Sequence, residues 1–380
     1  MNLVWIVIGL FLLTLTLWDV FETVVVPRPT PGYFRIGRYV VRSAWRGLRR
    51  LMQPASAERR DYVFGLFGPA IAIVLLATWI VFLLLAYGFV LYGVRDQIAP
   101  VPESFSTTVY VAGSSLLTLG SADFVAVGGV ARAVVLVAGA TGLMVVALVV
   151  TFLFSIYGSY QRRELEVIRL QATAGAPPSA VALLEAFQQL GFADRLPAFF
   201  VVWQRWAAEV LDSHIAYPVL AWFRSSHDNL SWISALGAVL DAACLVLTTI
   251  RDLPRGDAEL VRRVGAHLVE DMSNLGFRAG VSTALDREGF ELVCARLAAV
   301  GYQLEPIDEA WPRFEAARSQ YIERLEAMAA YWAVTATSWL GSMEELRSVV
   351  HLVEESAARA EGGAPKHAKA ATPAARARKA

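Results

Sequence analysis

The stretch ESFSTTVYVAGSSLLTLGSAD, residues 103 to 123, decides the fold of this chain, because it is apolar but too short to cross a membrane. Residues 103 to 117 follow two prolines and supply roughly 15 positions for a helix, enough for half of a hydrocarbon core about 30 Å thick. A half-helix that ends in an irregular loop is tolerated at membrane depth only where protein or a water-filled cavity shields its backbone. One subunit offers little shielding, so the stretch predicts several copies assembled around an axis.

Three longer apolar segments surround this stretch, at residues 3 to 26, 63 to 94 and 131 to 158. Each supplies the roughly 20 apolar residues that a membrane-spanning helix needs. The 380 residues are 56% hydrophobic and have a mean hydropathy of +0.48, which places the chain in the membrane class. The first segment lacks a basic beginning and a small-residue cleavage site, so we interpret it as a membrane helix and not as a signal peptide.

Positive charges are distributed unevenly around these segments. Between residues 95 and 130 the only basic residue is Arg95, whereas the loop after the first segment is crowded with Arg28, Arg35, Arg38, Arg42, Arg46, Arg49, Arg50, Arg59 and Arg60. Because basic loops stay in the cytoplasm, we expect a multi-pass protein of the cell (inner) membrane with its N-terminus outside. Residues 27 to 62 and everything after about residue 160 are then cytoplasmic.

Residues 33 to 52 combine regularly spaced arginines with aromatic and apolar residues in a helical pattern. Three prolines, at positions 27, 29 and 31, separate this segment from the first span. The pattern indicates an interfacial helix that lies on the inner leaflet, with its arginines against anionic headgroups. Whether its basic face has a role beyond enforcing topology is left open by the sequence.

The more polar remainder, residues 161 to 358, is predicted to be a helical cytoplasmic domain, with a break at Gly175 before a new helix. Residues 229 to 250 and 327 to 343 are apolar enough to resemble spans. The first of these contains Asp241, which costs about 2.5 to 3.5 kcal/mol at the centre of a membrane helix. We therefore predict both as core helices of the domain. Residues 359 to 380 are expected to form a disordered basic tail.

Residues 63 to 160 resemble the two-helix pore module of the bacterial potassium-channel superfamily. The TLGSAD sequence is similar to the family's TVGYGD selectivity filter, which it matches at Thr118, Leu119, Gly120 and Asp123. Arg132 and Gly139 or Gly142 are similar to the basic residue and the hinge glycine of the family's inner helix. The resemblance implies an all-α homotetramer. Each subunit would have three transmembrane helices, with a re-entrant pore helix and filter loop, and a helical cytoplasmic domain.

On this interpretation the chain has four parts. Residues 1 to 62 form the first transmembrane helix and the interfacial helix, residues 63 to 160 the pore module, residues 161 to 358 the cytoplasmic domain and residues 359 to 380 the tail.

Ser121 and Ala122 depart from the family's filter. Ala122 occupies the place of a glycine with positive φ, a conformation that costs alanine about 1 to 2 kcal/mol. Ser121 lacks the aromatic ring that wedges the family's filter in place, which implies a wider and more hydrated mouth. The resemblance then implies that residues 118 to 120 bind K⁺ or Na⁺ with reduced selectivity. The carboxylates of Asp123, Asp96 and Glu103 would concentrate cations at the mouth, although Asp96 and Glu103 are equally explained as solvated loop residues.

Two further groups of polar residues are candidates for gating or ligand contacts. Asp19 and Glu22 lie on one face of the first span, where carboxylates suggest a function or a buried partner. A salt bridge to an arginine such as Arg28 or Arg35 is the alternative. The second group lies in the cytoplasmic region and could form a ligand pocket or a pH-sensitive contact, although ordinary helix ends explain it equally well: His214, Arg224 and His227.

The leading hypothesis is a monovalent cation channel gated by its cytoplasmic domain, through an unknown cytoplasmic ligand. The alternative, favoured by Ser121 and Ala122, is a non-conducting membrane sensor or receptor that retains the pore scaffold. We find no catalytic constellation and no phosphate loop, and Cys244 and Cys294 fit no metal-ligand spacing and are expected to be buried thiols. We therefore expect no enzyme activity, no cofactor, no nucleic-acid partner and no metal beyond the permeant cation. The expected partners are the lipid bilayer and the other subunits.

Overall fold

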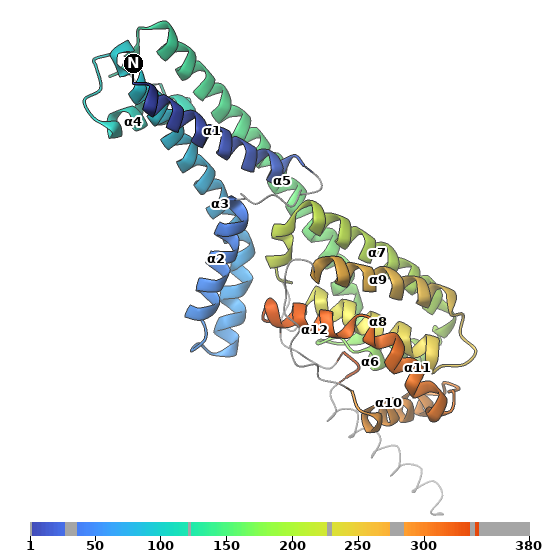
Figure 1. Ribbon diagram of the computed structural model, residues 1–380. Coiled ribbons are helices and arrows are strands. Elements are labelled where there is room, and N and C mark those ends of the chain that lie inside the picture. Colours follow the sequence, from blue (N-terminus) through green and yellow to red (C-terminus); the bar gives the residue numbers. More distant parts are fainter. Residues whose placement is uncertain are drawn as a thin grey trace, which may run out of the picture.

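The computed structural model shows an elongated all-α molecule with a membrane bundle at one end and a helical domain at the other (Figure 1). It describes residues 2–26, 36–120, 123–225, 230–273, 285–334 and 339–341. Ser121, Ala122, His227, Arg28, Arg35 and the predicted tail lie outside the described residues.

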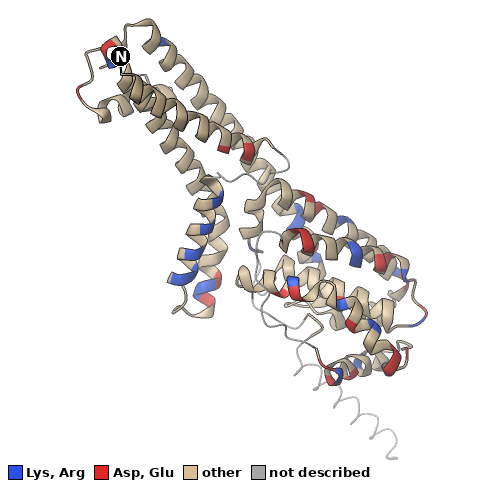
Figure 2. Cartoon of the chain, viewed as in Figure 1, with Lys and Arg blue, Asp and Glu red and all other residues tan. Residues whose placement is uncertain are grey.

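Three of the described helices are long and apolar enough to cross a membrane, which confirms the three predicted spans: α1 (Leu3–Val24), α3 (Ala57–Gly93) and α5 (Gly129–Ala174). With 37 and 46 residues, α3 and α5 measure about 55 and 69 Å, far more than a bilayer core requires. Figure 2 shows that charged residues are sparse along these helices and gather on their extensions and on the helical domain. The chain is therefore a membrane protein whose spans continue beyond the membrane.

The extension of α5 spans residue 161, the predicted start of the more polar region, and reaches the predicted break at Gly175. The helix continues through this position without interruption and ends only before Gly175, whose φ of 80° allows the chain to turn. The next helix, α6 (Ala180–Gln189), is capped by the Ser179 hydroxyl, as its sequence predicts. One continuous helix therefore joins the membrane bundle to the helical domain.

Helices α1 and α3 pack closely at the end that holds the N-terminus. A Cβ atom at Gly9 would lie 2.6 Å from the Ala86 carbonyl oxygen, so only glycine permits this approach. The backbone amide of Asn2 donates to the Gly93 carbonyl at 2.7 Å. Small residues at helix contacts are typical of membrane bundles, in which van der Waals packing drives association.

The basic helix α2 (Ile36–Leu51) packs against α3, a contact that the sequence did not predict, while its place at the inner leaflet stays a prediction. Gly37, near its beginning, packs on Leu75, and Trp45 packs on Phe64 and Phe67. Positions later in α2 thus meet earlier positions in α3, and the two helices run antiparallel (Figure 1). The buried residues of α2 are Gly37, Val41 and Trp45, whereas Tyr39 and Leu51 stay exposed.

The helical domain surrounds α8 (Trp232–Thr248), whose residues 232 to 246 are all buried. Residues 229 to 250 therefore supply a core helix, as predicted, and the described part of residues 327 to 343 also packs on this core. Asp241 is buried at the centre, where Arg318 Nε donates to it at 3.0 Å and Tyr321 Oη donates as well. The other elements are η2 (Ala193–Arg195), α7 (Leu196–Ala216), η3 (Pro218–Trp222), α9 (Gly256–Ser273), α10 (Arg287–Ala299), α11 (Ile307–Ser319) and α12 (Ile322–Tyr331).

Both cysteines of this domain are buried free thiols, as expected. Cys244 lies in α8 with its sulfur 3.6 Å from Tyr321 Oη, and Cys294 lies in α10. Burial raises the pKa of each thiol to about 12. Because the thiolate is the reactive form, both side chains act as core residues.

Candidate functional site

The short helix α4 (Phe105–Leu116) lies between α3 and α5 and ends inside the membrane bundle. The Ser104 hydroxyl caps its beginning by accepting from the Thr107 amide at 3.2 Å. At its other end, a Cβ atom on Gly142 of α5 would fall 1.8 Å from the Leu116 carbonyl oxygen. Gly142 lies 13 residues after the first residue of α5, which is about 20 Å along the helix axis. The end of α4 is therefore deep within the bundle.

The loop after α4 turns its amide groups back toward the helix. The Thr118 amide donates to Ser115 O, while the amides of Leu119 and Gly120 both donate to Ser114 O. Thr118 and Gly120 have φ values of 56° and 74°, in the left-handed region. No described residue donates a hydrogen bond to the carbonyl oxygens of residues 118 to 120, and all three residues are exposed. These carbonyls are available to an ion, to water or to another chain.

This arrangement favours a cation electrostatically. The C-terminal end of a helix carries the equivalent of about half a negative charge, and α4 presents that end to the loop. Backbone carbonyls are the groups that replace the hydration shell of K⁺ in a selectivity filter. Within the described residues there is no group of three or more His, Cys, Asp or Glu side chains that could hold a metal ion in another way.

The connections on either side of α4 are held together at the same end of the molecule. β1 (Ile98–Ala99) pairs antiparallel with β2 (Val125–Ala126), and η1 (Arg95–Gln97) precedes β1. Gln97 Oε1 accepts from the amides of Val130 and Ala131 and so caps the beginning of α5. Arg132 Nε donates to Ala126 O at 3.1 Å. These loops carry the predicted mouth carboxylates, all exposed: Asp96, Glu103 and Asp123.

The two glycines predicted as a hinge face the end of α4. A Cβ atom at Gly139 would lie 3.4 Å from Ser115 O, an ordinary contact, whereas the 1.8 Å at Gly142 excludes any side chain without movement of backbone. Tyr87 Oη and Thr141 Oγ1, 2.7 Å apart, link α3 to α5 beside them. The structure thus gives Gly142 a packing role, and hinge motion stays a prediction.

Asp19 is buried near the end of α1, where the structure gives it partners that the sequence did not indicate. Trp79 Nε1 donates to Asp19 Oδ2 at 2.8 Å, and the Gly37 amide donates to its carboxylate at 3.3 to 3.4 Å. Gly37 is in the first turn of α2, where backbone amides have no acceptor within the helix. Asp19 therefore satisfies one of these amides and stabilises the positive end of that helix. Glu22 is also buried.

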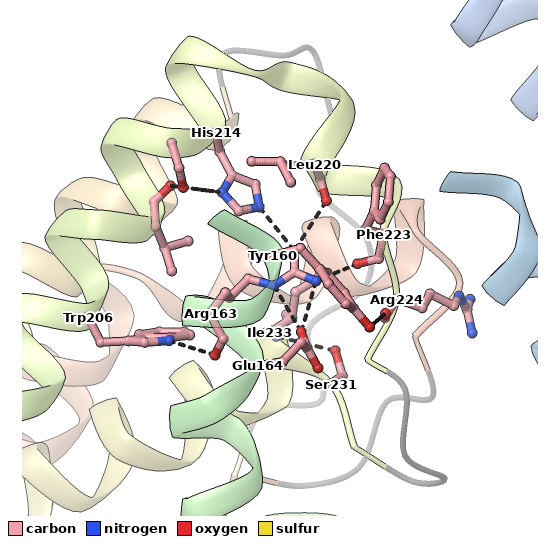
Figure 3. A network of polar contacts seen from close by, with 12 residues as sticks. Tyr160, Arg163, Glu164, Trp206, His214, Leu220, Phe223, Arg224, Ser231 and Ile233 are labelled. Atoms are coloured by element: carbon pink, nitrogen blue, oxygen red, sulfur yellow. Dashed lines mark hydrogen bonds and ion pairs between the residues drawn. The ribbon is translucent and has the colours of Figure 1, made fainter. Parts of the chain in front are cut away.

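A buried arginine organises the junction between α5 and the helical domain (Figure 3). The guanidinium of Arg163 donates to Glu164, to His214 Nε2 and to the carbonyls of Leu220 and Phe223. Its Nη2 lies 2.9 Å from Glu164 Oε1, and the group lies over the Trp232 ring at 5.5 Å. One side chain of α5 therefore holds η3 and the segment after it.

His214 belongs to this network in a neutral form, so of the two interpretations that the sequence left open, a pH-sensitive contact and an ordinary structural role, the hydrogen bonds favour the structural one. Its Nδ1 lies 2.8 Å from Val210 O and must donate, and its Nε2 must accept from Arg163, since a guanidinium only donates. Burial, and then the positive charge of Arg163, lowers the pKa of His214 to about 3. A proton on Nε2 would also face a cation, so His214 stays uncharged at neutral pH.

Arg224 extends the junction to α3. Its Nη1 donates to Asp61 of α3 at 2.7 Å, and its Nη2 donates to the carbonyls of Trp332 and Ala333 at 2.7 Å. Beside it, Trp45 Nε1 and Arg49 Nη1 of α2 donate to Tyr331 O. The end of α12 thus bonds to α2 and to Arg224, and Arg224 links it to α3.

The structure brings together two of the three cytoplasmic candidates, His214 and Arg224, through Phe223 and Arg163. Sequence reasoning missed Arg163, the residue that connects them. Arg163 and Glu164 follow directly on the apolar segment, where a basic residue is ordinarily solvated, so the sequence carried no signal for burial. The sequence also carried no signal for the contact of Trp206, whose Nε1 donates to Arg163 O at 3.0 Å.

Comparison with known proteins adds only the membrane class. The chain is 25% identical over 250 residues to the uncharacterized membrane protein YdjJ of Bacillus subtilis (strain 168), an alignment that covers 65% of this chain and 70% of YdjJ. The sequence matches no known protein family. No solved structure is significantly similar to it.

Proposed function

We propose that this chain is one subunit of a homotetrameric monovalent cation channel of the cell membrane, gated by its cytoplasmic helical domain. The observation that carries the proposal is the end of α4, deep in the bundle, followed by exposed carbonyls at residues 118 to 120 that no described residue satisfies. At membrane depth such backbone groups need protein or water around them. Copies arranged around an axis supply both, and the carbonyls then surround a path for ions.

The proposal includes a direction of insertion. The N-terminus and the loops between α3 and α5 would face outward, and α2 with the helical domain would face the cytoplasm, because α2 carries arginines and no acidic residue. A cysteine introduced at Asn2 should react with a membrane-impermeant reagent from outside, whereas one at Ala370 should not. Equal labelling of both positions from one side would contradict this direction.

Flux measurements test the proposed activity. The purified chain, reconstituted in liposomes, should pass K⁺ and Na⁺ when either gradient is imposed. Gly120→Ala should lower the flux at least tenfold, because alanine at a φ of 74° costs about 1 to 2 kcal/mol in each subunit. Gly129→Ala is the matched control, since its added Cβ meets no atom within 4 Å.

The oligomeric state of both variants should equal that of the wild type. If the wild-type tetramer is silent in both gradients over a range of pH, the non-conducting receptor is the better function. Equal flux in Gly120→Ala would instead place the ion path elsewhere in the molecule.

A further inference from the structure

A cavity of about 350 Å³ lies between α5 and α7, beside the buried arginine network. Its lining comes from α5 just beyond the apolar part of that helix, from the last three turns of α7 and from the residue that follows α7. Arg163 and Trp206, both buried and bonded to each other, belong to this lining (Figure 3). Cavities of roughly 300 to 1,000 Å³ between structural units are typical of small-molecule sites.

The two helices present polar side chains to the cavity in pairs three residues apart, a spacing that places both members on one face of a helix. Ser159 and Arg162 come from α5, and Glu209 and Asp212 come from α7. Arg162 Nη2 donates to Ser159 Oγ at 3.1 Å but has no ion pair within the described residues. Neither Glu209 nor Asp212 makes an ion pair or a side-chain hydrogen bond with any residue that the structure describes. Opposite charges therefore line one cavity without contacting each other.

This distribution of charge discriminates against ligands with a single charge. An anion that is attracted to Arg162 is repelled by two carboxylates, and a cation that is attracted to the carboxylates is repelled by Arg162. Arg163 adds positive charge on the side of α5, although its hydrogen bonds are directed to Glu164, to His214 and to backbone carbonyls. A ligand that carries both charges gains at both ends, because hydrogen bonds between charged groups are about twice as strong as neutral ones.

Two further observations narrow the chemistry of the ligand. The Tyr217 hydroxyl lines the cavity and has no hydrogen-bond partner among the described residues, so it is free to donate to an anion. The cavity also lies where the apolar part of α5 ends, since Arg132 is the only charged residue of that helix before Arg162. Lipid headgroups lie at this level of a membrane helix, and a headgroup that carries both charges joins a phosphate to an ammonium.

We propose that this cavity binds a phosphoethanolamine group, with its phosphate against Arg162 and the Tyr217 hydroxyl and its ammonium against Glu209 and Asp212. The group belongs either to a lipid of the adjacent leaflet or to a soluble molecule, and the contacts are the same in both cases. Such a ligand bridges α5 and α7. It stabilises the docked arrangement of the helical domain, because a ligand shifts an equilibrium toward the state that it binds more tightly. This binding does not rest on the proposed channel function.

The test uses the full chain in nanodiscs of phosphatidylglycerol, a lipid without an ammonium group. The probe is O-phosphoethanolamine, and the readout is the shift of the thermal unfolding midpoint. The probe should raise the midpoint in a saturable way. Inorganic phosphate, which lacks the ammonium, and ethanolamine, which lacks the phosphate, should leave the midpoint unchanged at the same concentrations. An equal response to either of these two ions would overturn the proposal.

Substitutions in the lining test the assignment of each end. The double variant Glu209→Gln, Asp212→Asn should raise the apparent dissociation constant at least tenfold, and so should Arg162→Gln. All three side chains are exposed, so the ligand-free midpoint should stay close to that of the wild type. The controls are Arg205→Gln, on α7 but outside the lining, and Asp194→Asn, just before α7, which should leave the constant unchanged. Unchanged binding in the double variant, or an equal loss in the controls, would contradict the proposed contacts.

Nanodiscs that also contain phosphatidylethanolamine identify the source of the group. If a lipid is the occupant, this lipid should raise the midpoint of the wild type but not of the double variant, and should remove the response to the soluble probe. If a soluble molecule is the occupant, the lipid should change neither the midpoint nor the response. A protein that responds to neither the probe nor the lipid would refute the site.

Because the readout is unfolding and not flux, failure of this site is distinguishable from failure of the channel. Flux without any midpoint response would refute the site alone, and a response in a silent protein would refute the channel alone.

Discussion

The carbonyl groups of residues 220 to 223 and of residues 118 to 120 both follow or end a helix, but they differ in their hydrogen-bond donors. At residues 220 to 223, the carbonyls of Leu220 and Phe223 accept hydrogen bonds from the buried guanidinium of Arg163. At residues 118 to 120, no described residue donates to the carbonyls, although they follow a helix that ends deep in the bundle. Unsatisfied carbonyls at such depth are costly.

At the junction, a side chain of the same subunit satisfies the carbonyls. In the loop after α4, the carbonyls need a donor or a cation from outside the described residues. The junction can be tested by removing its internal donor. The loop after α4 can be tested only in the presence of ions, lipid and other copies. The predictions below disturb one side of this comparison at a time.

The largest effect is expected from removing the donor at the junction. Arg163→Met leaves Glu164 as a buried charge without its partner and two carbonyls without donors, which should lower the free energy of unfolding by about 3 to 5 kcal/mol. Arg169→Met is the control on the same helix, because its ion pair with Glu166 is exposed and worth about 0 to 1 kcal/mol. Denaturant unfolding of the full chain measures both. Similar losses in the two variants would mean that Arg163 is not the organising residue.

At the loop after α4, Gly142→Ala should displace the end of α4. Its Cβ atom meets the Leu116 carbonyl, and overpacking of this kind costs about 1 to 3 kcal/mol. In the proposed channel, cation flux should fall at least tenfold. Gly139→Ala should keep most of the flux, because its Cβ atom makes an ordinary contact. If both variants lost flux equally without loss of stability, the hinge hypothesis would be preferred to packing.

Acid should weaken the junction through His214. The unfolded chain binds a proton on this residue below its ordinary pKa of about 6.5, while the folded chain does not until about pH 3. Its contribution to stability is therefore complete above pH 6.5 and is lost as the pH falls, by about 2 kcal/mol between pH 7 and pH 5. His214→Gln keeps an acceptor for Arg163 and should flatten this part of the stability curve. An unchanged curve would show that His214 is protonated in the folded protein.

The smallest change in stability is expected where the junction reaches α3. Asp61→Asn removes the charge opposite Arg224, but the Asp61 side chain is 57% exposed, so the loss should stay below about 1 kcal/mol. Arg224 keeps its carbonyl acceptors at the end of α12. In the proposed channel this substitution should alter the response to a ligand more than the stability, which single-channel recording would detect. A loss of several kcal/mol would mean that the contact is structural.

Much of the fold follows from local patterns. The three apolar segments of membrane length correspond to α1, α3 and α5. The half-length apolar segment after two prolines corresponds to α4, and the glycine and two prolines near residue 176 precede α6. The buried position of α8 was also predictable, because Asp241 is costly in lipid but acceptable in a protein core that supplies Arg318 and Tyr321.

The candidate site was predicted less completely. The TLG residues could be located by their place after α4, and the exposed acidic residues by their place in the connections on either side of it. Nothing in the sequence indicated that Gly142 abuts Leu116 O or that Trp79 donates to Asp19. Both contacts join residues of different helices. Periodicity within one helix does not identify the atom that approaches from another.

Sequence alone determined which segments are apolar for long enough to enter a membrane, since that depends on a sum of transfer free energies along the chain. Tertiary structure alone decided the partners: α2 packs against α3, Arg163 is buried and not solvated, and His214 is neutral because it accepts from Arg163. The physical reason is that burial, hydrogen-bond partners and pKa depend on the distances between side chains of different helices, which no single segment encodes.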